Sequence, residues 1–172
     1  AFCLYKIVPA AQLMRLPESL STRAAALAEP TAIAIHTANL SGATSDDRVL
    51  VTGGGPVGLL TTAVLRARGV TDITVSEPTP LRRERALAVG AARVIEPSDL
   101  RRAPMGRPVT EPYSLVFECS GNAAAAESAF DQLDYAGTLV FVGTRHEMPR
   151  INHNRAIVLE LTIIAAYNYD MD

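Results

Sequence analysis

Residues 49–60, VLVTGGGPVGLL, restrict the fold of this chain more than any other stretch. An apolar run ends there at three consecutive glycines, and a proline and a fourth glycine precede the next apolar residues. Glycine loses more conformational entropy on folding than any other residue. Such a cluster therefore indicates a sharp backbone turn, or a place where another group closely approaches the main chain.

Short apolar runs alternate with helical stretches from residue 48 onward. We expect helices at 59–69, 81–90 and 123–137. We expect strands at 49–52, 73–76, 93–95, 115–119, 138–143 and 160–167. The strands are continuous apolar runs, as is typical of a parallel sheet that helices cover on both sides. The pattern predicts an α/β fold, a doubly wound (Rossmann) parallel sheet of about six strands with helices on both faces.

The first part of the chain has a different pattern and no glycine-rich loop. Residues 2–9, FCLYKIVP, predict a strand closed by Pro9. Residues 16–43 predict helical segments interrupted by Pro30.

Length and charge exclude several classes of protein. With 172 residues, 48% of them apolar, the chain is long enough for one domain with a sizeable core. The formal net charge is −2 and the basic residues are spread along the sequence, which argues against binding to nucleic acid. No apolar run approaches the roughly 20 residues of a membrane span, and the first residues lack a signal-peptide pattern. We expect a cytoplasmic protein that binds neither nucleic acid nor membrane.

The two cysteines give no framework for a disulfide or a metal. Cys3 and Cys119 are far apart and neither belongs to a C-x-x-C pair. Cys119 follows an apolar run, and we interpret it as a small core residue.

The glycines of the opening stretch have the G-x-G-x-x-G spacing of a dinucleotide-binding loop between a strand and a helix. Gly53 would permit the tight turn, Gly55 would let a pyrophosphate approach the backbone, and Gly58 would let the helix pack closely. Pro56 suits the first helical turn, where unpaired N–H groups favour an anion. Together with Val57, these residues form the predicted phosphate site.

An acidic residue in the expected place supports this interpretation. Glu77 follows the second strand, where a carboxylate can accept hydrogen bonds from the hydroxyls of the adenosine ribose. It would repel a 2′-phosphate, so NAD is the predicted cofactor. Arg82 and Arg83 weaken that preference, because either guanidinium could reach a 2′-phosphate, and NADP stays an alternative. Arg82 could also stack on the adenine or touch the ribose.

With these motifs, the chain resembles the medium-chain, zinc-type alcohol dehydrogenase superfamily, and most closely its polyol and threonine dehydrogenase branch. The resemblance covers nearly the whole chain. The segments that carry it are YKIVP, LPESLS, AALAEPTAIAIH, VLVTGGGPVGLL, ITVSEPTPLRRERALAVGAARVI, LVFECSGN, GTLVFVGT and ELTIIAAYNYD.

The resemblance implies further cofactor contacts. After the fourth and fifth expected strands, the residues that would line the cofactor are Ser120, Gly121, Val142, Gly143 and Thr144. After the sixth, the main chain that would meet the nicotinamide amide belongs to Ala166, Tyr167 and Asn168.

The resemblance also implies zinc in the intact protein. Glu29, in LAEP, matches a glutamate beside the catalytic zinc in the polyol branch, although it reads equally well as a helix-end carboxylate. His36 is interpreted as a core or interface residue.

We expect residues 1–45 to be the end of the catalytic domain with connecting helices, and residues 46–172 to be the dinucleotide-binding domain. The N-terminal GroES-like catalytic domain and the C-terminal return segment are expected to be absent.

The implied function is that of the cofactor-binding domain of a zinc-type oxidoreductase, which transfers hydride between a small-molecule alcohol (a polyol or amino alcohol) and NAD. A homo-oligomer is expected, and the isolated chain is expected to be inactive. The alternatives are a zinc-free quinone reductase-like domain and a nucleotide-binding or SAM-binding module without dehydrogenase activity. A short-chain dehydrogenase is disfavoured, because its glycine spacing fails at Val57 and Leu59.

Overall fold

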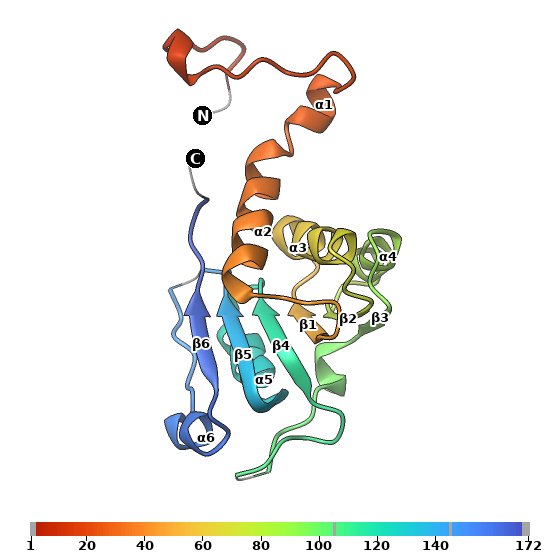
Figure 1. Cartoon of the computed structure of the whole chain (residues 1–172), viewed down its shortest axis with the longest axis vertical. Coiled ribbons are helices and arrows are strands. Elements are labelled where there is room, and N and C mark those ends of the chain that lie inside the picture. Colours follow the sequence, from red (N-terminus) through yellow and green to blue (C-terminus); the bar gives the residue numbers. More distant parts are fainter. Residues whose placement is uncertain (1–2, 105, 145, 170–172) are drawn as a thin grey trace.

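The computed structural model describes residues 3–104, 106–144 and 146–169. Its centre is a six-stranded parallel sheet in the order β3-β2-β1-β4-β5-β6, which confirms the predicted fold class (Figure 1). The strands are β1 (Arg48–Thr52), β2 (Asp72–Ser76), β3 (Arg93–Ile95), β4 (Tyr113–Glu118), β5 (Leu133–Phe141) and β6 (Thr162–Ala165). The α-helices are α1 (Thr22–Ala25), α2 (Ala28–Ser41), α3 (Pro56–Ala67), α4 (Pro80–Ala88), α5 (Ala123–Asp131) and α6 (His153–Val158). Two 3-10 helices, η1 (Ala10–Gln12) and η2 (Pro97–Asp99), complete the list.

Alternate residues of the strands face two separate hydrophobic clusters. In β1, Val49 and Val51 pack with residues of α2, α3 and α4, whereas Leu50 packs with residues of α5. Successive side chains of a strand point to opposite faces of the sheet, so these helices cover both faces. None of the helices among the described residues is long and apolar enough to span a membrane.

The strand order places the loops that follow β1, β2 and β4 side by side at the carboxyl edge of the sheet. The carboxyl ends of β1, β2 and β4 are in register, with Thr52 opposite Ser76 on one side and Glu118 on the other. The chain connects β1 to β2 in one direction and later adds β4 on the other side of β1. Ligands of open parallel sheets bind outside the carboxyl ends at such a reversal of strand order.

The prediction of a strand at residues 2–9 is wrong for residues 3–9, the part of this segment that the structure describes. Residues 3–9 form no strand, and Leu4, Tyr5 and Ile7 are 94%, 93% and 101% exposed. This segment lies far from the sheet at the top of Figure 1. It has strand-like composition but no neighbouring strand among the described residues to accept its backbone hydrogen bonds.

Two helix boundaries also differ from the prediction. Pro30 does not interrupt a helix, because it lies in the first turn of α2, where a missing N–H group breaks no hydrogen bond. The helix expected at 123–137 ends at Asp131, and β5 begins at Leu133, which is fully buried and pairs with Tyr113. Helix α6 was not predicted.

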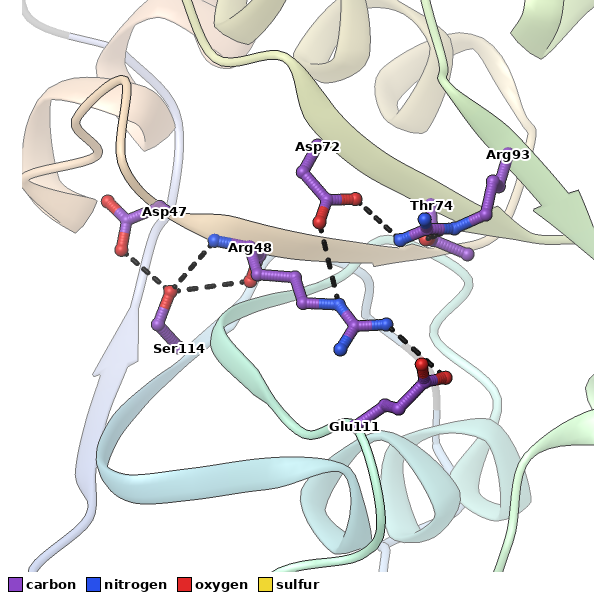
Figure 2. A network of polar contacts seen from close by, with 7 residues as sticks. All are labelled: Asp47, Arg48, Asp72, Thr74, Arg93, Glu111 and Ser114. Atoms are coloured by element: carbon purple, nitrogen blue, oxygen red, sulfur yellow. Dashed lines mark hydrogen bonds and ion pairs between the residues drawn. The ribbon is translucent and has the colours of Figure 1, made fainter.

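Charged side chains gather at the amino ends of β1, β2 and β3 (Figure 2). Asp72 lies between two arginines, 3.6 Å from Nε of Arg48 and 2.5 Å from a terminal nitrogen of Arg93. Arg48 also lies 3.7 Å from a carboxylate oxygen of Glu111 and 5.0 Å from the ring centre of Tyr113. These contacts join three strands to the loop that precedes β4.

Candidate functional site

The carboxyl ends of β1, β2 and β4 border a cavity of about 450 Å³. Several of the predicted cofactor residues line it together. They are Gly53, Gly55, Glu77, Arg82 and Ser120. The structure therefore brings residues from three separate segments of the chain to one cavity.

The glycine loop has the local geometry that its spacing predicts at Gly53 and Gly58. Gly53 has a φ of +95°, which L-residues with a side chain rarely adopt, and its N–H donates to the carbonyl of Ser76 at 2.8 Å. A Cβ atom at Gly58 would lie 1.9 Å from the carbonyl oxygen of Gly53. The turn and the start of α3 therefore fit together only without that side chain.

Gly55 differs from its neighbours, because a Cβ atom there would find no atom within 4 Å. Its φ of −75° is also compatible with other residues. No described contact inside the protein requires a glycine at this position. The lack of a side chain leaves open space directly before α3, whose first residue is Pro56 and whose first intrahelical bond runs from Leu59 N–H to the Gly55 carbonyl. The first-turn N–H groups of a helix, here at Val57 and Gly58, favour an anion in such a space.

Glu77 supports the glycine loop from the end of β2. Its side chain is almost fully buried, and its carboxylate accepts hydrogen bonds from the N–H groups of Gly54 at 2.7 Å and Thr79 at 2.9 Å. Burial alone would raise the pKa of this carboxyl, but the two backbone N–H groups and the nearby Arg82 outweigh it, so the pKa lies below its usual value. Glu77 is therefore a charged group at the rim of the cavity.

The two arginines after Glu77 have different surroundings. Arg83 donates to the carbonyls of Glu77 and Pro78 and pairs with Glu96 at 2.9 Å. Arg82 lines the cavity, is half exposed, and lies 3.9 Å from the carboxylate of Glu77. Of the two arginines, Arg82 is the one that lines the cavity.

A second buried carboxylate, Glu118, was missed by the sequence analysis. It is 1% exposed and accepts hydrogen bonds from Ser120 N–H at 2.8 Å and from Gly121 N–H at 3.1 Å. The hydroxyls of Ser120 and of Thr52, the latter at 3.4 Å, also donate to it. The signal in the sequence was a single acid at the end of the apolar strand, LVFEC, where burial is costly without such partners.

The loops after β4 and β5 meet beside Glu118. Its backbone carbonyl accepts from the N–H groups of Val142 and Gly143, both at 2.9 Å. A Cβ at Gly121 would lie 2.9 Å from the carbonyl oxygen of Thr144, and one at Gly143 would lie 2.3 Å from the nitrogen of Gly121. The structure thus brings together the predicted residues of these two loops.

The predicted residues after β6 lie at the same edge of the sheet. Ala166 is buried, and its N–H donates to the carbonyl of Phe141 at the end of β5. Tyr167 is 76% exposed, and Asn168 has a φ of +59°. Their contact with a cofactor stays a prediction.

The described residues do not by themselves form a zinc site, and the role of Glu29 beside zinc stays a prediction. Glu29 is exposed on α2, and the described residues contain no group of three His, Cys, Asp or Glu side chains that could hold a metal ion. Burial first, and the nearby Glu118 second, raise the pKa of the Cys119 thiol to about 12, so the thiol is protonated near neutral pH. An open zinc site needs about three protein ligands, and the described part of the chain does not supply them.

Comparison with known proteins identifies the family. A family model described as zinc-binding dehydrogenase matches residues 56–172, more than half of the chain. The chain belongs to this family. The resemblance noted from the sequence is thereby confirmed.

The individual proteins that the chain resembles are also named as dehydrogenases. L-threonine 3-dehydrogenase of Pyrococcus horikoshii is 34% identical over 165 residues, which cover 95% of this chain and 47% of that protein. Human sorbitol dehydrogenase is 29% identical, with 93% of this chain and 46% of that protein covered. The chain thus spans about half the length of the curated relatives it matches. A structure of a zinc-binding dehydrogenase from Sinorhizobium meliloti 1021 bound to NADP has a TM-score of 0.85 and 28% identity, and covers 95% of this chain and 50% of that one.

Proposed function

We propose that this chain is the part of a zinc-type alcohol dehydrogenase that binds the nicotinamide dinucleotide. The observation that carries the proposal is the open space at Gly55, directly before the N-terminus of α3 and bordered by the buried carboxylate of Glu77. A pyrophosphate needs this combination of a backbone without a side chain and a helix N-terminus.

The remaining predicted site residues have roles in this proposal. Gly53 and Gly58 fix the turn, and Ser120 and Gly121 border the crevice after β4. The loop residues Val142, Gly143 and Thr144 would support the nicotinamide half from β5. The backbone of Ala166, Tyr167 and Asn168 would meet its amide group after β6. In this arrangement the two halves of the cofactor lie on opposite sides of β1.

We propose NAD as the cofactor, because the ionised carboxylate of Glu77 disfavours a second negative charge at the adenosine ribose. NADP is the alternative, since Arg82 faces the same cavity and one similar structure contains NADP. Residues 46–172 would form the cofactor domain, and residues 1–45 would belong to the end of a catalytic domain.

In the whole protein we propose that an alcohol, either a polyol or an amino alcohol, gives its hydride to the nicotinamide. The named activities of two relatives, threonine and sorbitol dehydrogenation, support this substrate class. Glu29 would contribute to the zinc site only together with ligands from outside the residues described here, because those residues contain no group of three His, Cys, Asp or Glu side chains that could hold the metal. This chain's own contribution is to hold and orient the cofactor.

The proposal is tested by calorimetric titration of the 172-residue chain with NAD⁺ and with NADP⁺ at moderate salt. We expect NAD⁺ to bind more tightly, Glu77→Gln to narrow the gap, and Arg82→Ala to weaken NADP⁺ more than NAD⁺. Arg83→Ala is the matched control, because Arg83 already pairs with Glu96 and backbone carbonyls. Absence of binding of both dinucleotides would contradict the proposed function. Tighter binding of NADP⁺ would contradict only the choice of cofactor.

A further inference from the structure

Glu118 is a buried carboxylate at the end of β4 that has no assigned role in the proposed function. It is buried, and its described partners are neutral donors: the N–H groups of Ser120 and Gly121 and the hydroxyls of Ser120 and Thr52. An ionised carboxylate accepts hydrogen bonds and donates none, which matches this set. None of the ion pairs among the described residues involves Glu118.

The surrounding backbone keeps this carboxylate in place. Gly143 lies so close that a Cβ atom there would be 3.0 Å from Oε2 of Glu118. A neighbouring cavity of about 240 Å³ is lined by Glu118 and Glu147 and by no described Arg, Lys or His. The charged groups among the described residues that line this cavity are therefore both carboxylates.

The order of the strands determines which half of the cofactor lies near Glu118. Glu77 follows β2 and Glu118 ends β4, and these strands are the two neighbours of β1, which leads into the glycine loop. A pyrophosphate at Gly55 with the adenosine ribose toward Glu77 leaves the nicotinamide half on the side of β4 and β5.

The two redox forms of the cofactor differ in charge in that half alone. The nicotinamide ring carries a positive charge when it is oxidised and none when it is reduced, whereas the adenosine and pyrophosphate parts are the same in both. We propose that the charge of Glu118 raises the affinity of the crevice for the oxidised nicotinamide dinucleotide relative to the reduced one. The inference rests on the proposed function, and it assigns to Glu118 an electrostatic role in addition to positioning the loops after β1 and β4.

The test compares the affinities of NAD⁺ and NADH for the same 172-residue chain by calorimetry. Glu118→Gln removes the charge but keeps an oxygen that can accept from Thr52, Ser120 and Gly121. Glu118→Asp keeps the charge on a shorter side chain. Glu84→Gln, which removes an exposed carboxylate on α4, is the matched control. Circular dichroism and thermal unfolding check that each variant is folded.

We expect Glu118→Gln to lower the ratio of NAD⁺ affinity to NADH affinity by roughly five- to tenfold, because the variant loses the attraction of a buried negative charge for the positive ring at an effective dielectric constant near 20. Glu118→Asp and Glu84→Gln should keep the preference of the unaltered chain. Equal changes in both affinities in folded Glu118→Gln would overturn the inference and leave Glu118 as a structural residue, with the proposed function intact. Failure of the unaltered chain to bind either form would overturn both.

Discussion

The two edges of the sheet use charged residues in different ways. At the amino edge, Arg48 and Arg93 both pair with Asp72, and all three side chains are partly exposed to solvent. At the carboxyl edge, Glu77 and Glu118 are buried, and most of their partners are backbone N–H groups. Both edges are polar, and at the carboxyl edge the buried carboxylate of Glu77 borders the cavity that also contains the glycine loop.

The charged residues of the amino edge therefore stabilise the sheet, whereas those of the carboxyl edge form a site prepared for a ligand. Partly exposed ion pairs hold strands together and contribute little free energy each, because water screens them. Buried carboxylates that accept from loop N–H groups fix the backbone of those loops before a ligand arrives. Preorganised polar groups reduce the cost of binding, so the carboxyl edge is the one expected to respond to a dinucleotide.

The largest effect on folding is expected from Gly58→Val at the carboxyl edge. The new Cβ would lie 1.9 Å from the Gly53 carbonyl oxygen, so the glycine turn or α3 would have to move. We expect a loss of about 3 kcal/mol or more in the free energy of unfolding, measured by urea denaturation. Ala67→Val, at an exposed position of the same helix, is the control and should cost only a few tenths of a kcal/mol. Equal stability of both variants would show that the close approach at Gly58 is unimportant.

A smaller effect is expected from Glu77→Gln, and it should depend on pH. Folding lowers the pKa of Glu77, so ionised Glu77 stabilises the folded chain above its usual pKa of 4.5, and this contribution is lost as the pH falls through the folded value. Near pH 7 we expect the variant to be less stable by about 1–2 kcal/mol. The difference should shrink as the pH falls from the usual pKa toward the folded value, and it should be smallest below the folded value, where Glu77 is neutral like the glutamine. Urea denaturation at a series of pH values measures it, and a difference that grows on acidification would reverse the assigned direction.

The smallest effects are expected at the amino edge. Arg48→Ala removes ion pairs with Asp72 and Glu111 and the contact with the Tyr113 ring, which together are worth about 1 kcal/mol. Arg93→Ala, at a more exposed side chain, should cost less. Neither variant should change the affinity for NADH. A selective loss of NADH binding in folded Arg48→Ala would mean that the two edges are coupled.

The sequence was sufficient to predict the features that depend on local spacing. The turn at Gly53, the close packing at Gly58 and the alternation of strands and helices follow from the order of neighbouring residues. Features that depend on distant partners were missed. The polar partners of Glu118 include Thr52, 66 positions away, and the end of α5 depends on the pairing of Leu133 with Tyr113. Residues 3–9 have the composition of a strand, but strand formation also needs a neighbour.

We propose that position 55 is a glycine because a pyrophosphate occupies the space beside it. Titration of Gly55→Val with NADH tests this claim most directly, since a Cβ there meets no protein atom within 4 Å and its φ of −75° suits valine. We expect the free energy of unfolding of Gly55→Val to lie within about 0.5 kcal/mol of that of the unaltered chain. Gly55→Ala should bind NADH more weakly than the unaltered chain, and Gly55→Val should show no measurable binding. A folded Gly55→Val chain with unchanged affinity for NADH would contradict the account.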